Sequence, residues 1–271
     1  MTELRKRTTR LAEAAARLAG TTRDTGFPAA VPPQRNRLLA ALPPEELDQL
    51  LAELETVTLG TMEMLAELGG PQDYIYFPLT SIISVIRPAG DGSFIETGTI
   101  GCEGVAGITA LIGRWSPAKL ETQVPGLCLR MPSDRFREMI GDLPRTRSVM
   151  GTFVLSFIDQ AGQNIVCNAR HSLSRRCARW MLMAHDRVGG DTFTLTHEVL
   201  AQMLAVRRAG VSEAAYALKQ AGVIDYRHGK ITILDRAGLE AAACECYAIN
   251  RGHLDALYAS EMVEPMAIFD A

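Results

Sequence analysis

The sequence predicts an α+β protein in which a β-rich N-terminal module is followed by a long helix and a C-terminal winged helix-turn-helix. Three patterns indicate this order. Residues 192–236 read as helix, tight turn, helix and hairpin, residues 60–131 hold short apolar runs between turn signals, and residues 143–169 hold apolar side chains at helical spacing. With 271 residues, the chain is long enough for two domains.

The first helix of residues 192–236 is predicted to begin at Thr196, whose hydroxyl can cap it, with Glu198 in the first turn where the helix dipole favours an anion. Leu195 and Leu200 occupy the staple positions on either side of that cap. One apolar stripe at helical spacing follows: Val199, Leu200, Met203 and Leu204.

A short break at Ala205 and Val206 separates this helix from a second one, predicted from about Arg207 to Ala221. Gly222 stands where a left-handed cap would end it. The inward side chains of the second helix are Val211, Ala214 and Leu218, and the opposite face holds Arg208, Ser212 and Tyr216.

Two β-rich runs come next, Val223 to Tyr226 and Lys230 to Ile233, and Arg227-His228-Gly229 between them suits a hairpin. Helix, turn, helix and wing are together typical of domains that lay their second helix in the major groove of DNA. The competing interpretation, a helical hairpin buried in a core, is disfavoured by the adjacent Arg207 and Arg208 at the start of the second helix.

The expected DNA contacts divide by role. Arg208 is expected to read a base edge, with guanine as the partner, and Arg207 to contact phosphate or a base. Glu213 either accepts a hydrogen bond from cytosine or repels phosphate without contact. The second helix and the wing are expected to supply phosphate contacts through Lys219, Arg227, His228 and Lys230. The candidate DNA-binding residues are therefore Thr196, Arg207, Arg208, Ser212, Glu213, Tyr216, Lys219, Arg227, His228 and Lys230.

Charge divides the chain. Residues 36–132 contain 12 acidic and 5 basic side chains, a balance of −7, and residues 172–236 contain 10 basic and 6 acidic ones, a balance of +4. The overall net charge of −3 hides this asymmetry. A basic C-terminal module joined to an acidic N-terminal module fits a protein that binds a polyphosphate through its C-terminal part.

The acidic part is predicted to be a barrel or sandwich of short strands, preceded by a helix from Leu38 to Leu54. The expected strands cover 74–77, 81–86, 93–97 and 127–131. After Pro132 the pattern becomes helical. Apolar side chains then recur every three or four residues, at Val149, Met150, Phe153, Val154, Phe157, Ile158, Ala161 and Ile165. This helix is predicted to form a dimer seam, with packing inside its own subunit as the alternative.

Several classes of protein are disfavoured. No apolar run approaches a membrane span, and the N-terminal stretch lacks the apolar core of a secretion signal, so a cytoplasmic protein is expected. We find no P-loop, nucleophile elbow or assignable carboxylate pair, and therefore predict no enzyme. His197-Glu198 begins like a zinc-protease motif, but Ala201 stands where the second histidine is needed.

The six cysteines show no zinc-finger spacing, so reduced thiols and no metal site are expected. Cys244 and Cys246 form the one close pair. We interpret them as packing residues, because the sequence offers no partner cluster for them, with a redox or metal pair as the alternative.

The strand-rich module, long helix and winged helix-turn-helix resemble, in that order, the Crp/Fnr superfamily of bacterial transcription regulators. The resemblance covers roughly residues 36–247, and its most specific stretches are LTHEVLAQMLAVRRAGVSEAAYALKQAGVI, IDYRHGKITILDRAGLE and CECY. It implies a jelly-roll-like β-roll of the cyclic-nucleotide-binding type and a homodimer formed through the long helix. It also implies that the second helix of the helix-turn-helix enters the major groove of DNA.

The resemblance implies five segments: an N-terminal arm and linker (1–35), a sensor domain (36–142), a dimerisation helix (143–169), the winged helix-turn-helix domain (170–247) and a C-terminal tail (248–271). The implied partners are double-stranded DNA, a second copy of the chain, RNA polymerase and an unidentified small-molecule effector.

The recognition helix departs from the family pattern. Ala205 replaces the usual turn glycine, Ala209 and Glu213 stand where the family has Glu or Pro and a later Arg, and Gly210 weakens the helix by roughly 1 kcal/mol relative to Ala. The operator is therefore expected to differ from the best-known half-site. Gly210 and Glu213 also support the alternative of an adaptor whose degenerate helix-turn-helix binds protein.

The nucleotide site departs further. The family's ribose-binding Glu aligns with Ile108, and no Arg stands near Lys119 at the phosphate-binding place. We therefore expect no usual cyclic-AMP binding, and Glu103, Arg114 and Lys119 are the weaker candidate ligand residues. No cysteine precedes Cys102, which disfavours an iron–sulfur cluster, and the five histidines lie outside residues 36–132, which disfavours haem. No cofactor is predicted.

Overall fold

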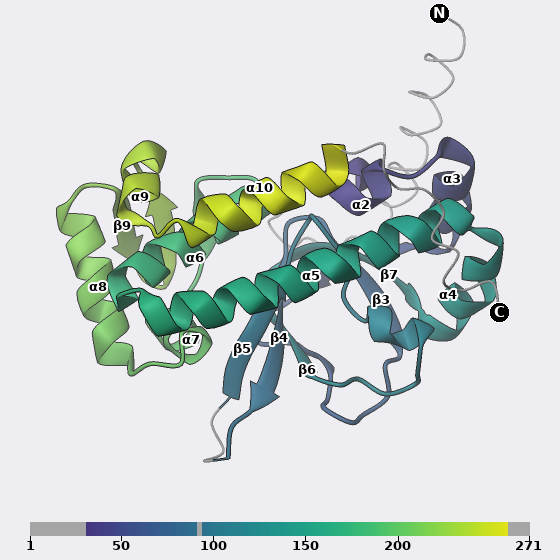
Figure 1. The fold of residues 1–271 in the computed structure, drawn as a ribbon, viewed down its shortest axis with the longest axis horizontal. Helices are drawn as coiled ribbons and strands as arrows, with labels where there is room; N and C mark the ends of the chain where they lie inside the picture. Colours follow the sequence, from purple (N-terminus) through teal and green to yellow (C-terminus); the bar gives the residue numbers. More distant parts are fainter. Residues whose placement is uncertain (1–30, 91–93, 260–271) are drawn as a thin grey trace, which may run out of the picture.

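The computed structural model describes residues 31–90 and 94–259 (Figure 1). It confirms the predicted α+β architecture, with a β-rich domain, one long helix across its front, and a smaller helical domain at the far end of that helix. The predicted N-terminal arm lies almost entirely outside the described residues, since only its last five residues are described.

The β-rich domain is built from two antiparallel sheets. One has the order β1-β7-β3 and the other β2-β6-β4-β5, with facing residues such as Tyr76 and Arg130, or Ile83 and Ile100. The strands are β1 (Glu55–Leu59), β2 (Met64–Ala66), β3 (Tyr74–Pro78), β4 (Ile82–Pro88), β5 (Phe94–Ile100), β6 (Lys119–Val124) and β7 (Gly126–Pro132). Four of these were predicted; β1, β2 and β6 were not, because they are short or lack an apolar run.

Short helices frame the sheets. The prediction of a single helix from Leu38 to Leu54 is wrong. This segment forms two helices, because Pro43 and Pro44 cannot continue the first one. Asn36 caps the first helix by accepting a hydrogen bond from the Leu39 amide at 3.2 Å. The elements are η1 (Pro33–Arg35), α2 (Arg37–Ala40), α3 (Pro44–Glu53), η2 (Ile108–Leu111), α4 (Ser133–Met139) and η3 (Ile140–Asp142).

The long helix α5 (Pro144–Arg170) lies within one residue of its predicted range, but its apolar side chains serve two surfaces. One group faces the core of the β-rich domain: Val149, Met150 and Phe153. A second group is exposed along the helix: Leu155, Ile158, Ile165 and Val166. The predicted dimer seam mixed these two groups, because a 27-residue helix that is apolar on two sides shows no single stripe.

The C-terminal domain surrounds its own apolar core. Its elements are α6 (Leu173–Val188), β8 (Thr192–Thr194), α7 (His197–Met203), α8 (Arg208–Gln220), β9 (Ile224–Arg227), β10 (Lys230–Ile233) and α9 (Arg236–Ala242). The wing is a three-stranded sheet of order β8-β10-β9. Ile82 and Val124 of the β-rich domain belong to the same core, so the two domains pack directly on each other.

The helix α10 (Cys246–Ala259) crosses the boundary predicted at residue 247. It runs antiparallel to α5 and packs beside it, with His253 Nδ1 2.6 Å from Asp159 Oδ2 (Figure 1). Residues 248–259, assigned to a C-terminal tail by the resemblance, therefore lie in a helix that packs on α5. No helix in the described ranges has the length and apolar character needed to cross a membrane.

Candidate nucleic-acid interface

The turn between α7 and α8 brings the predicted motif into the expected geometry. Thr196 Oγ1 accepts from the Val199 amide at 3.2 Å, so Thr196 caps α7 as predicted. Ala205 has a φ of +52°, the left-handed region where the family has glycine. Val211, Ala214 and Leu218 of α8 are buried as predicted, and Gly222 ends the turn after α8 with a φ of +75°.

The outer face of α8 carries exposed side chains at the start and middle of the helix. Arg207 is the N-cap residue, and Arg208, Glu213 and Tyr216 are exposed on α8. Arg208 Nε lies 3.9 Å from Glu198 Oε2, but both side chains remain largely in solvent. A weak, exposed pair of this kind leaves the guanidinium free to exchange its partner for a base or a phosphate.

Ser212 does not point outward as a base reader. Its hydroxyl donates to the Arg208 carbonyl at 3.1 Å and lies 2.9 Å from His197 Nδ1. The His197 ring stacks on Tyr226 of the wing, with the ring centroids 4.1 Å apart. Burial, with a smaller effect from Arg208, lowers the pKa of His197. His197 therefore joins α7, α8 and the wing, a role that the sequence analysis missed by testing this residue only as a zinc ligand.

The wing turn contains two residues, His228 and Gly229, with φ values of +49° and +76°. Positive φ at both positions is the type I′ geometry of a tight hairpin, so Arg227 lies in β9 and not in the loop as predicted. Lys230 is exposed at the start of β10.

Two of the predicted phosphate contacts already have a partner. Lys219 Nζ lies 2.7 Å from Asp225 Oδ1, and Arg227 Nε lies 2.8 Å from Asp225 Oδ2. The hydrogen bond from Lys219, together with the Tyr226 amide and the nearby Arg227, lowers the pKa of Asp225. Asp225 thus holds two cations at the edge of the surface where DNA is expected.

Gly210 lies at the contact between α8 and α6. A Cβ at this position would lie 2.9 Å from Leu173 Cδ2, the end of a flexible, half-buried side chain that would have to shift slightly for alanine.

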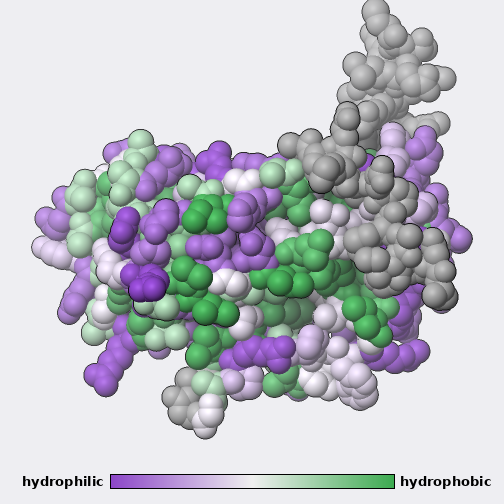
Figure 2. All heavy atoms as spheres, in the orientation of Figure 1, coloured by the Kyte–Doolittle hydropathy of each residue, from purple (hydrophilic) through white to green (hydrophobic). Residues whose placement is uncertain are grey.

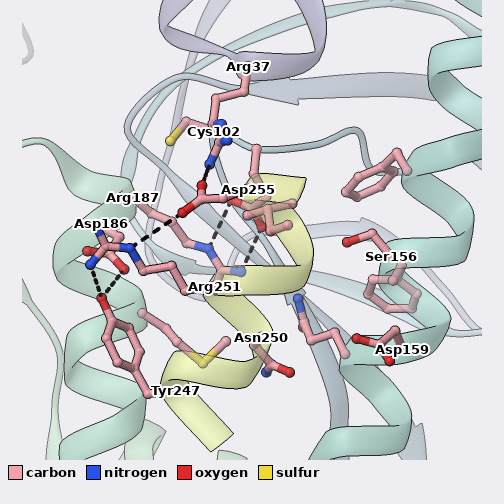
Figure 3. A pocket seen from close by; sticks show the side chains of 16 residues that line it. Arg37, Cys102, Ser156, Asp159, Asp186, Arg187, Tyr247, Asn250, Arg251 and Asp255 are labelled. Atoms are coloured by element: carbon pink, nitrogen blue, oxygen red, sulfur yellow. Dashed lines mark hydrogen bonds and ion pairs between the residues drawn. The ribbon is translucent and has the colours of Figure 1, made fainter. Parts of the chain in front are cut away.

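The weaker candidate ligand residues do not share one site. Glu103 lines a cavity of ≈ 250 Å³ between α5, α6, α10 and the loop after β5 (Figure 3). Arg114 is exposed in the loop before β6, and Lys119 pairs with Glu121 and lies over the Phe94 ring. Neither Arg114 nor Lys119 lines this cavity.

The charged groups of this cavity have partners, either within the lining or, for Asp159 and Asp186, in His253 and Arg236 beside it. Arg37 Nη1 lies 2.9 Å from Asp255 Oδ1, and Arg251 Nε lies 3.7 Å from Asp255 Oδ2, as Figure 3 shows. Tyr247 donates to Asp186 Oδ2 at 2.9 Å. Glu103 itself is bound to Arg187. The lining holds three arginines and four carboxylates, so the cavity has no excess of positive charge.

The prediction that Cys244 and Cys246 have no partner cluster is wrong. The structure brings them together with Cys167 and His171, and one ligand atom from each of the four residues lies within 4.8 Å of the others. The sequence could not show this grouping, because Cys167 and Cys244 are separated by 77 residues.

The comparisons with known proteins agree with this geometry. Residues 175–242 match the family model for a Crp-like helix-turn-helix domain. FixK2 from Bradyrhizobium japonicum superposes with a TM-score of 0.59 and 14% identity over 70% of this chain and 98% of that one. CLP from Xanthomonas campestris, described as a c-di-GMP-responsive global regulator, gives a TM-score of 0.55 and 15% identity over 70% and 98%.

TTHA1359 from Thermus thermophilus, a transcriptional regulator of the CRP/FNR family, gives a TM-score of 0.52 and 23% identity over 70% of this chain and 98% of that one. No curated protein matches the chain significantly. At these identities the solved structures establish the fold, and the family model establishes the domain. The chain has the fold of the Crp/Fnr-type transcription regulators, and its residues 175–242 form a Crp-like helix-turn-helix domain.

Proposed function

We propose that the protein is a homodimeric regulator that binds DNA in a sequence-specific manner and controls transcription. The observation that carries this proposal is the exposed start of α8, where Arg207 and Arg208 stand at the beginning of the second helix of a Crp-like helix-turn-helix. Lys230 of the wing adds an exposed cation to the same domain. A helix in the major groove would place Arg208 at a base edge, where a bidentate contact to guanine is the usual choice.

The dimer rests on the exposed side of α5. Leu155, Ile158 and Ile165 are 59%, 61% and 71% exposed, and they recur at the three- and seven-residue offsets of a coiled-coil seam. Figure 2 shows hydrophobic surface along this helix. A second copy packed against this seam would bury it and would present two α8 helices to two half-sites.

The proposed input does not include cyclic AMP bound in the usual way. Ile108, at the position of the ribose-binding carboxylate, packs its apolar side chain against the core of the β-rich domain. The cations that line the cavity beside α5, such as Arg37 and Arg251, have carboxylate partners. Another small molecule, or none, would then control the protein. The proposal includes contact with RNA polymerase, and this part rests on the family resemblance alone.

The test is selection from a pool of random duplexes with the full-length protein, followed by binding of the enriched sequence and of unselected duplex at one salt concentration. We expect a two-fold symmetric site with half-sites one helical turn apart and at least about 10³-fold tighter binding than to unselected duplex. Arg208→Ala should cost on the order of 1–3 kcal/mol on the selected site and relax one position per half-site. Equal affinity for selected and unselected duplexes would overturn the proposal and favour a protein-binding adaptor.

A further inference from the structure

Four metal-ligating side chains converge where α5 ends and α10 begins. Cys167 lies in the last turn of α5 and His171 is the C-cap residue of that helix, four positions later. Cys244 and Cys246 lie on either side of Glu245, at the start of α10. The three cysteines are buried and form a cluster of their own, separate from both apolar cores.

The separations between these atoms match the edges of a metal tetrahedron. Cys167 Sγ lies 3.5 Å from Cys244 Sγ, and Cys246 Sγ lies 3.5 Å from His171 Nδ1. Tetrahedral zinc, with Zn–S of about 2.3 Å and Zn–N of about 2.0 Å, sets ligand atoms roughly 3.5–3.8 Å apart. All four ligand atoms already lie within 4.8 Å of one another, so small movements of side chains suffice to seat an ion.

The surroundings orient the ligands as outer-shell groups do in zinc proteins. His171 directs Nδ1 toward the thiols, and its Nε2 lies 3.0 Å from Glu245 Oε1. A carboxylate on the far nitrogen fixes the ring and its tautomer and strengthens the ligating nitrogen. Gln163 Nε2 donates to Cys246 Sγ at 3.1 Å, a bond that a thiolate accepts better than a thiol.

A buried arginine supplies an independent sign of negative charge at this place. Arg179 of α6 is 5% exposed, and its charge acts on the thiols of Cys167 and Cys244. Its Nη2 donates to Asn164 Oδ1 at 2.8 Å, while Nε and Nη1 have no hydrogen-bond partner among the described residues. A divalent ion held by three thiolates and one imidazole carries a net charge of −1, which a guanidinium neutralises.

We propose that Cys167, His171, Cys244 and Cys246 bind a structural Zn²⁺ ion that ties the end of α5 to the start of α10. Thiolate and imidazole ligands select zinc over magnesium or calcium, which prefer oxygen. Four protein ligands close the coordination shell, so the ion holds structure and performs no catalysis. On binding, the three thiols release their protons to solvent. The ion thereby fixes the C-terminal domain to the helix that carries the proposed dimer seam.

The test is metal analysis of the full-length protein purified under reducing conditions, with Cys177→Ser as the matched control. Cys177 is also a buried free cysteine, but it lies in the core of the C-terminal domain, outside the cluster. We expect one zinc per chain in the wild type and in Cys177→Ser, and little or none in Cys244→Ser and Cys246→Ser. Wild-type protein with no zinc, or with another metal in its place, would overturn the proposal.

A second measurement does not depend on the folding of the variants. Wild-type protein stripped by a chelator and titrated with Co²⁺ should develop the intense visible bands of a tetrahedral ion and the ultraviolet bands of thiolate ligation, and Zn²⁺ should displace them. Rebinding of Zn²⁺ should also raise the melting temperature. Weak octahedral bands, or a Cys167–Cys244 disulfide found by mass spectrometry of the native protein, would contradict the site.

Discussion

Arg187 and Glu103 form a two-point ion pair in the interior of the molecule. Arg187 Nη2 lies 2.7 Å from Glu103 Oε1, and Arg187 Nε lies 3.0 Å from Glu103 Oε2. Their side chains are 8% and 5% exposed. Arg187 belongs to α6 and Glu103 to the loop after β5, so this pair fastens the C-terminal domain to the β-rich domain. A Cβ at Gly101 would lie 2.4 Å from Arg187 Cδ, which explains the glycine beneath the guanidinium.

Arg187→Met should therefore destabilise the fold by about 3–5 kcal/mol, because it leaves the Glu103 carboxylate buried without its partner. The measurement is urea unfolding at neutral pH. Arg135→Met is the control, since Arg135 lies 2.9 Å from Glu53 in a solvent-screened pair, and it should cost far less than Arg187→Met. Equal losses in the two variants would mean that the Arg187 pair contributes no more than a surface pair. Adding Glu103→Gln to Arg187→Met should restore part of the loss.

Ala205→Gly should stabilise the protein by about 1 kcal/mol. An L-residue in the left-handed region costs roughly 1–2 kcal/mol, and the greater freedom of glycine in the unfolded chain offsets part of that gain. Ala205 has a φ of +52° and is exposed, so the change removes little packing. Thermal unfolding measures it. Ala217→Gly, at an exposed position in the interior of α8, should instead destabilise the protein by roughly 1 kcal/mol. A loss of stability in both variants would contradict the strain at Ala205.

The sequence predicted the elements that carry a clear period and missed the contacts between them. α5, α7, α8 and the wing follow from apolar spacing and caps, as at Thr196 and Gly222. β6 was missed because three of the four residues of LETQ within it are polar. Arg187 is 84 residues from Glu103, and no local pattern reports such a pair. The zinc ligands were missed for the same reason, since two short motifs become one site only after α10 folds back along α5.

Asp225→Asn should raise the affinity for random duplex DNA and steepen its salt dependence. The change removes a negative charge next to the expected DNA surface and releases Lys219 and Arg227 for phosphate. Each new phosphate contact should add about 0.9 to the slope of log affinity against log salt. Titration at several salt concentrations measures this slope. Glu240→Gln removes the same charge on α9 and should leave the slope unchanged. If the slope is the same in both variants, Lys219 and Arg227 do not contact phosphate.

Ile158→Glu should convert the proposed dimer into monomers at micromolar concentration, because it would place a charge in the centre of the seam formed with Leu155 and Ile165. Sedimentation velocity measures the change. Asn168→Glu, an equally charged replacement at an exposed position off that stripe of α5, should remain dimeric. If Ile158→Glu sediments as the wild type does, the dimer uses another surface. Loss of specific DNA binding should accompany dissociation, since one chain reads one half-site.

Glu96 should make the fold less stable as pH rises from about 5 to 8. Burial raises the pKa of Glu96 to about 7, against an ordinary value of 4.5, although Ser84 and Gln123 both donate to its Oε2, at 2.7 and 3.0 Å, and Arg187 and Arg179 oppose the shift. The folded state therefore binds a proton that the unfolded state has already released in this range. The stabilisation is fully present below about pH 4.5 and is lost as pH rises through 7.

Melting temperatures across this range measure the effect. Glu96 lies at the contact between the β-rich domain and α7, so its ionisation is expected to weaken that contact. Glu96→Gln keeps a neutral, hydrogen-bonding side chain and should flatten this part of the pH dependence, with its largest gain over the wild type at pH 8. Glu67→Gln, at an exposed position on the β-rich domain, should follow the wild type. If Glu96→Gln instead lowers the melting temperature most at high pH, the carboxylate is stabilising when charged, and Arg187 and Arg179 outweigh its burial.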